Sequence, residues 1–100
     1  MAVGKDISVD YLKEVGKRIK KRRVVKKLSL EKLGLEVGLT RMQMHRIESG
    51  YNITLKTILK LAIALDTKPD ALIKSKTRFK KEDLERLVNS SKSSRQKRKA

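Results

Sequence analysis

The sequence has no cysteine, a single histidine and few aromatic residues, and each shortage excludes a class of function. Without cysteine the chain can form neither disulfide bonds nor thiolate metal sites, and His45 alone provides no histidine cluster for a metal. The only aromatic residues are Tyr11, Tyr51 and Phe79. This shortage argues against a protein that binds RNA or single-stranded DNA by stacking bases on aromatic side chains. We therefore expect no metal site.

Acidic residues and long apolar runs are also scarce. Lysine and arginine number 27 against 11 aspartates and glutamates, and the resulting formal net charge of +16 favours nucleic acid over membrane as a partner. No apolar run approaches the roughly 18 residues of a membrane span, and residues 1–10 lack the apolar stretch of a secretory signal. We expect a cytoplasmic protein without membrane contact. Without paired carboxylates near a base or a glycine-rich phosphate loop, we expect no enzyme activity and no cofactor.

Helical periodicity extends over residues 11–74 and predicts one all-α domain, a compact five-helix bundle. Residues 1–10 are polar and predict a loose N-terminal arm. In the first helix, Leu12, Val15 and Ile19 form one apolar stripe. The other positions of that helix are mostly basic, and their density predicts phosphate contact, with simple solubilising charge as the alternative. The candidates are Lys17, Arg18, Lys21 and Arg22.

Two short helices, at 29–37 and 40–49, are the most informative feature. Their first residues, Ser29 and Thr40, each provide a hydroxyl that can cap a helix N-terminus. Gly38 between them tolerates the left-handed conformation that ends a helix. A turn this short sets two helices roughly perpendicular, which is the helix-turn-helix geometry, and the second helix can enter a DNA major groove.

Two further helices and a basic extension complete the chain. Thr54 caps a fourth helix, and Pro69 marks the first turn of a short fifth helix. The residues expected to face inward from the fourth helix are Ile58, Leu59, Ala62, Ile63 and Leu65. Residues 75–100 form a basic C-terminal extension, for which we expect a short helix at 81–89 followed by a disordered tail.

The outward side of the helix at 40–49 suits the reading of bases. With Met44 and Ile47 turned to the core, the exposed residues are Arg41, Met42, Gln43, His45 and Arg46. Arginine can donate two bonds to guanine, glutamine can pair with adenine, and methionine can contact the thymine methyl group. Plain solvent exposure is the alternative for the two arginines, and packing against a dimer partner is the alternative for Met42.

An ordered set of short motifs extends over about residues 15–73. The motifs are Gly16-Lys17-Arg18-Ile19, Leu28-Ser29-x-Glu31-x-Leu33, Gly38-Leu39-Thr40-Arg41, Arg46-Ile47-Glu48-Ser49-Gly50, Leu59-x-Leu61-Ala62-x-Ala64-Leu65 and Pro69-Asp70-x-Leu72. This set resembles the lambda repressor and Cro-type helix-turn-helix domains, the XRE family. Each motif is weak alone, whereas the ordered set at these spacings is specific. The resemblance implies a five-helix bundle that usually binds DNA as a twofold dimer on a palindromic operator.

The resemblance also implies roles for individual residues. The family's base-reading positions fall on Arg41, Met42 and Arg46, with auxiliary contacts from Thr40, Gln43 and His45. Ser29 matches a phosphate-contacting helix start, and we assign phosphate contact to Thr40 as well. An arginine–glutamate pair that joins the first and third helices would be Arg23 with Glu48. Lys27 stands where glycine is common, which predicts a strained turn before the second helix.

Together these features predict a sequence-specific, double-stranded DNA-binding transcriptional regulator, repressor-like and homodimeric, that reads a palindromic operator through the helix at 40–49. Two alternatives on the same fold are a protein-interaction adaptor of the coactivator kind and an antitoxin that neutralises a toxin. An adaptor should expose an apolar stripe on this helix, which here is polar instead. The dimer contact is either the fifth helix or the stripe of Leu84, Leu87 and Val88.

Overall fold

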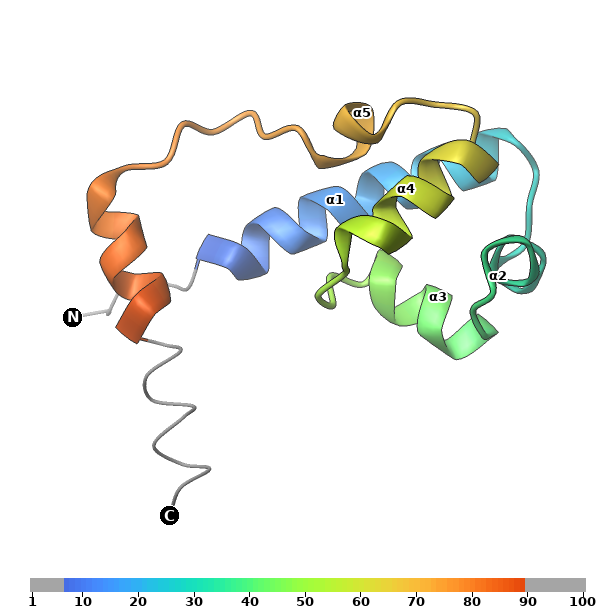
Figure 1. The fold of residues 1–100 in the computed structure, drawn as a ribbon, viewed down its shortest axis with the longest axis horizontal. Coiled ribbons are helices and arrows are strands. Elements are labelled where there is room, and N and C mark those ends of the chain that lie inside the picture. Colours follow the sequence, from blue (N-terminus) through green and yellow to red (C-terminus); the bar gives the residue numbers. More distant parts are fainter. Residues whose placement is uncertain (1–6, 90–100) are drawn as a thin grey trace, which may run out of the picture.

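The computed structural model describes residues 7–89, which form helices joined by short turns (Figure 1). The five helices of the bundle are α1 (Ile7–Val25), α2 (Leu30–Val37), α3 (Arg41–Glu48), α4 (Leu55–Ala64) and α5 (Pro69–Ile73). A further helix covers residues 81–89, and residues 7–89 contain no strand. The all-α fold class predicted from the sequence is therefore confirmed. The predicted disordered tail lies outside the described residues.

The start of α1 differs from the prediction of a loose arm over residues 1–10. Residues 7–10 are already helical, and Asp10 lies in the first turn, where a negative charge favours a helix N-terminus. The hydroxyl of Tyr11 donates to the carbonyl oxygen of Ile73, and its ring meets Phe79 edge-to-face with centroids 6.2 Å apart. These contacts hold the first turns of α1 against the chain after α5, which the local sequence does not reveal.

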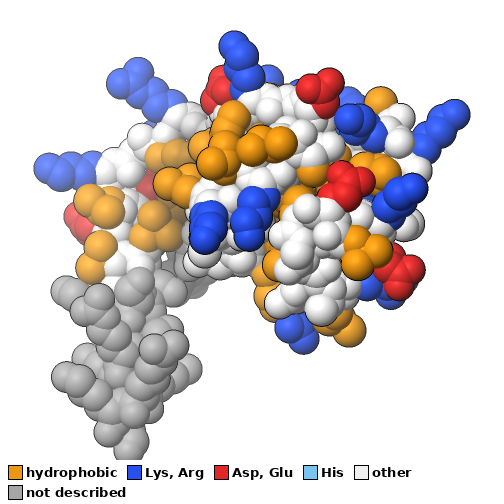
Figure 2. All heavy atoms as spheres, turned by 45° about the vertical axis from the view of Figure 1, so that its right-hand side comes forward, with side chains coloured by type: hydrophobic (Ala, Val, Ile, Leu, Met, Phe, Trp, Pro, Cys, Tyr) orange, Lys and Arg blue, Asp and Glu red, His pale blue; other side chains and the backbone are white. Residues whose placement is uncertain are grey.

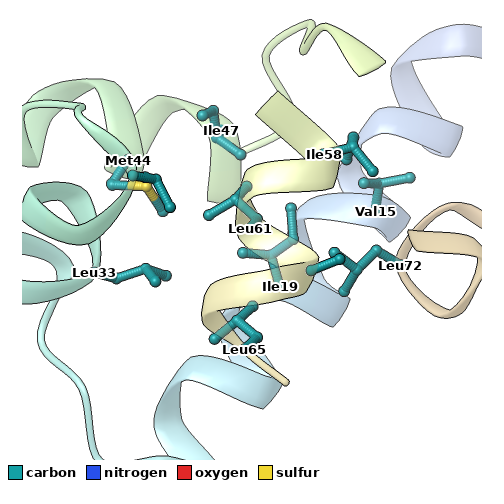
Figure 3. Packing of buried hydrophobic residues seen from close by; sticks show 11 residues of the cluster. Val15, Ile19, Leu33, Met44, Ile47, Ile58, Leu61, Leu65 and Leu72 are labelled. Atoms are coloured by element: carbon teal, nitrogen blue, oxygen red, sulfur yellow. The ribbon is translucent and has the colours of Figure 1, made fainter. Parts of the chain in front are cut away.

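The core takes residues from all five helices of the bundle (Figure 3). Its buried side chains are Val15, Ile19, Leu33, Val37, Met44, Ile47, Ile58, Leu61, Ala62, Leu65 and Leu72. Leu33 and Met44, from α2 and α3, point toward α4 in Figure 3. Burial of a large aliphatic side chain stabilises a fold by about 1.5–3 kcal/mol. The shared core therefore fixes how α2 and α3 cross and what α3 presents to solvent.

The inward face of α4 differs from the predicted one. Three of the five predicted residues are buried, but Leu59 is 50% exposed and Ile63 is 71% exposed, while Leu61 is fully buried. Apolar residues occupy most positions of α4, so periodicity alone does not tell which stripe faces the core. Leu55, Leu59 and Ile63 are spaced four residues apart and form an exposed apolar stripe along α4, which we call the α4 stripe.

The turns on either side of α2 each use a left-handed residue. Gly38, the C-cap of α2, has a φ of 76°, and its N–H donates to the carbonyl oxygen of Gly34. Lys27, in the turn before α2, has a φ of 60°, which is uncommon for a residue with a side chain. Lys27 thus adopts a conformation that glycine adopts more easily, in the turn for which the resemblance predicts strain.

Candidate nucleic-acid interface

The N-termini of α2 and α3 are capped by their own side chains. Oγ of Ser29 accepts the N–H of Lys32 at 3.0 Å. At α3, Oγ1 of Thr40 accepts the N–H of Gln43 at 3.1 Å, and Oε1 of Gln43 accepts the N–H of Thr40 at 2.8 Å. This reciprocal capping box fixes where α3 begins. The first turn of a helix has N–H groups without a partner inside the helix, and such groups can bind an anion.

Gly34 permits the close approach of α2 to the turn before α3. A Cβ atom built on Gly34 would lie 2.5 Å from the carbonyl oxygen of Leu39 and 3.2 Å from Cγ of Met44. The N–H of Leu39 donates to the carbonyl oxygen of Gly34 at 2.7 Å. Gly34 was not among the residues predicted from the sequence. A glycine inside a helix costs about 1 kcal/mol against alanine, and its presence there is a signal of close packing.

The predicted base-reading residues lie together on the solvent side of α3. Met44 and Ile47 are buried on the other side. The exposed residues are Arg41, Met42, Gln43, His45 and Arg46. This face carries two guanidinium groups, an amide, an imidazole and a thioether, and its composition offers donors, acceptors and a methyl group to base edges.

Two of these side chains are also held by contacts within the chain. Oε1 of Gln43 is engaged in the capping box, which leaves its amide group to act as a donor. The guanidinium carbon of Arg46 lies 5.9 Å from the centroid of the Tyr51 ring, a cation–π arrangement. This contact places Arg46 beside the loop after α3, which reduces the side-chain entropy that a contact with a ligand would cost.

An ion pair joins α1 to the end of α3. Nε of Arg23 lies 2.6 Å from Oε2 of Glu48, and Nη2 donates to Oε1 at 3.0 Å. Nη1 donates to the carbonyl oxygen of Leu28 at 2.8 Å. The side chains of Arg23 and Glu48 are only 11% and 6% exposed. The hydrogen bond that Arg23 donates to Glu48 raises the pKa of Arg23 above its ordinary value; the charge of Glu48 adds to this effect and burial opposes it.

Arg18, predicted to contact phosphate, is occupied by contacts inside the protein. It pairs with Glu14 at 2.6 Å, and its Nη1 donates to the carbonyl oxygens of Leu72, at 3.4 Å, and of Lys74. These bonds fasten the end of α5 to α1. Phosphate contact by Arg18 stays a prediction, but its guanidinium group is already engaged within the fold. The sequence did not reveal this engagement, because it depends on where α5 lies.

The other basic candidates of α1 do not lie beside α3. Lys17, Lys21 and Arg22 line a groove between α1 and the chain from the end of α4 onward. Gly16 faces α3, since a Cβ atom there would lie 2.5 Å from a backbone oxygen of α3. At about 100° per residue, Lys21 lies about 140° around α1 from Gly16. In Figure 1, α3 accordingly lies below α1, whereas α5 and the segment after it lie above.

Residues 7–89 contain neither a candidate metal site nor a candidate membrane span. Within them, histidine, aspartate and glutamate side chains form no group of three or more that could hold a metal ion. None of the helices in this part of the chain has both the length and the apolar character needed to cross a bilayer.

Comparison with known proteins gives a family and a similar solved structure. Residues 19–72 match a family model described as helix-turn-helix. The chain is similar to the high-resolution crystal structure of the restriction-modification controller protein C.AhdI from Aeromonas hydrophila. That similarity has a TM-score of 0.59 and 42% sequence identity, and it covers 63% of this chain and 96% of that chain. No curated protein sequence matches the chain.

Proposed function

The chain belongs to the helix-turn-helix family, and from that premise we propose that it is a sequence-specific, DNA-binding transcriptional regulator that acts as a homodimer. The resemblance stated from the sequence motifs is confirmed at the level of the family. The observation that carries the proposal is the exposed side of α3, where two arginines and other polar groups stand together on a capped helix. The similarity to C.AhdI, a restriction-modification controller, supports a regulatory role.

In this proposal α3 enters the major groove of the DNA duplex. Arg41 and Arg46 form paired hydrogen bonds with guanine, and Met42 contacts a thymine methyl group. Ser29 and Thr40 stand at the helix starts, where free N–H groups and the helix dipole attract phosphate. Auxiliary contacts come from Gln43 and His45. Phosphate contacts position the helix, and the side chains on its exposed side distinguish one sequence from another.

Selection of bound sequences from a random duplex pool tests the proposal directly. We expect one enriched motif with two inverted half-sites, because a twofold dimer presents two copies of α3 in opposite orientation. A pool without enrichment would contradict sequence-specific binding. An enriched motif without internal symmetry would contradict the homodimer but would still support sequence-specific DNA binding.

We expect DNA affinity to fall steeply with salt concentration. Each phosphate neutralised by a basic side chain adds about −0.9 to the slope of log K against log salt concentration. With a net charge of +16 and basic residues at the helix starts, such as Lys32 in α2 and Lys56 in α4, we expect a slope steeper than about −4. Titrating a labelled duplex with the protein at several salt concentrations, followed by fluorescence anisotropy, measures this slope. A flat response would argue against duplex DNA as the ligand.

We assign the dimer contact to the α4 stripe, a surface that the sequence analysis did not consider. Leu55, Leu59 and Ile63 are aliphatic, adjacent along α4 and at least half exposed. Figure 2 shows exposed hydrophobic side chains gathered beside basic ones on the face of the molecule that carries α4. An exposed apolar patch of this kind marks an interaction surface, and two copies of one stripe can pack across a twofold axis.

Charge placed in the α4 stripe should weaken the dimer. Leu59→Glu combined with Ile63→Glu brings four glutamates together at a twofold contact, and we expect the dimer dissociation constant, measured by sedimentation equilibrium, to rise at least about tenfold. The matched control is Leu84→Glu with Val88→Glu, which has the same spacing on the helix at 81–89. If only the control pair weakens the dimer, the dimer contact lies on the helix at 81–89. If neither pair weakens it, α5 is the remaining candidate for the dimer contact.

A further inference from the structure

A basic groove lies between α1 and the chain that follows α4. Its volume is about 710 Å³ and it has twelve lining residues, of which seven are basic, three apolar and two acidic. The lysines are Lys17, Lys21 and Lys26 from α1 and just after it, and Lys74 and Lys76 from the opposite wall. One acidic residue, Glu14, is already paired with Arg18. The groove therefore retains a strong positive charge.

The walls of the groove are held in place by the fold. Arg18 bonds to the carbonyl oxygens of Leu72 and Lys74, which ties the two walls together. Val25, Ala71 and Leu65 give the groove apolar lining, and Leu65 also belongs to the core. Val25 is 72% exposed, so its aliphatic side chain is open to a ligand. The groove thus combines positive charge with apolar lining between walls that Arg18 ties together.

The groove lies on the side of α1 that faces away from α3. Gly16 marks the side of α1 that touches α3, and the groove residues occupy the opposite side. A straight duplex bound along the exposed side of α3 leaves this groove open. The phosphate groups of a duplex also have no apolar surface to place against Val25. Both points favour a ligand other than the DNA that α3 reads.

We propose that this groove binds an acidic, amphipathic segment of a partner protein. Carboxylates of the segment pair with the lysines of both walls, and its apolar side chains lie on Val25 and Ala71. Charge complementarity favours an acidic partner over a second copy of this chain, which has 27 basic residues against 11 acidic ones. The proposal goes beyond DNA binding and does not depend on it, since a regulator could hold DNA on α3 and a protein on α1 at once.

Charge reversal on one wall of the groove tests the proposal. The probe is a labelled peptide of glutamate and leucine with its leucines at helical spacing, and an all-glutamate peptide serves as its comparison. Lys17→Glu with Lys21→Glu should weaken binding of the probe about tenfold. The matched control is Lys56→Glu with Lys60→Glu, an equally exposed pair at the same spacing on α4, which should change binding less than about twofold.

The outcomes separate the groove from general charge attraction. Equal weakening by the two pairs would overturn the proposal, because both change the net charge by the same amount. If the groove variant loses more affinity for random duplex DNA than for the peptide, the groove binds nucleic acid instead. Equal affinity for the glutamate–leucine peptide and the all-glutamate peptide would contradict a contribution of apolar contacts to binding. Lys74→Glu with Lys76→Glu, on the other wall, provides the same test if the first variant does not fold.

Discussion

Replacement of Arg23 by alanine is expected to lower the free energy of unfolding by about 3–5 kcal/mol, because the change leaves a buried carboxylate without its partner. Glu48 is only 6% exposed, and both of its oxygens accept bonds from Arg23. The same substitution removes the bond to the carbonyl oxygen of Leu28, in the turn that leads to α2. Chemical denaturation followed by circular dichroism measures the loss.

Two comparisons make this result specific to the ion pair. Arg22→Ala removes a neighbouring arginine from α1 and should change the free energy of unfolding by less than about 0.5 kcal/mol. A double-mutant cycle of Arg23→Ala with Glu48→Gln should give a coupling energy between about 0.5 and about 3 kcal/mol. A melting temperature that barely moves in Arg23→Ala, or a coupling energy near zero, would show that the pair does not hold α3 to α1.

The starts of α2 and α3 could be predicted from the sequence because their determinants are local. Ser29 and Thr40 cap the helices that directly follow them, and Gly38 ends α2 at the predicted residue. The side of α3 that faces solvent also followed from spacing, since Met44 and Ile47 are the apolar residues that α3 can bury. Short-range rules suffice where one segment contains its own cap, its own end and a single apolar stripe.

The rest depended on contacts between distant segments. The early start of α1 rests on Tyr11, whose partners Ile73 and Phe79 come more than sixty residues later. The inward face of α4 could not be chosen, because Leu61 and Leu59 are equally apolar in the sequence and only the packing of the bundle distinguishes them. In each case the sequence contained the residue but not the position of its partner.

The basic residues of α1 illustrate the same limit for the candidate site. Their density correctly indicated a cationic surface, but charge alone gives no direction around a helix. The position of Gly16 against α3 and of Arg18 against α5 shows that this surface and the exposed side of α3 lie apart. Base reading by the side chains of α3, as proposed above, therefore does not draw on this surface of α1.

Alanine at both Arg41 and Arg46 is expected to remove most of the preference for the selected operator. Each bidentate contact of arginine with guanine contributes about 1–3 kcal/mol, so the double variant should lose about 2–6 kcal/mol of operator affinity. Random duplex should be bound almost as before, because contacts to phosphate remain. Both arginines are exposed and alanine favours helix, so the free energy of unfolding should barely change. Anisotropy titrations with both duplexes at one salt concentration measure the difference.

The matched control for this prediction is lysine at the same two positions. Arg41→Lys with Arg46→Lys keeps both positive charges but loses the planar fork that pairs with two acceptors of guanine. If the arginines read bases, the lysine variant retains its affinity for random duplex and still loses affinity for the operator. If alanine weakens both duplexes equally and lysine restores the affinity for both, the arginines hold phosphate. Base reading then falls to Met42, Gln43 and His45, the remaining side chains on the exposed side of α3.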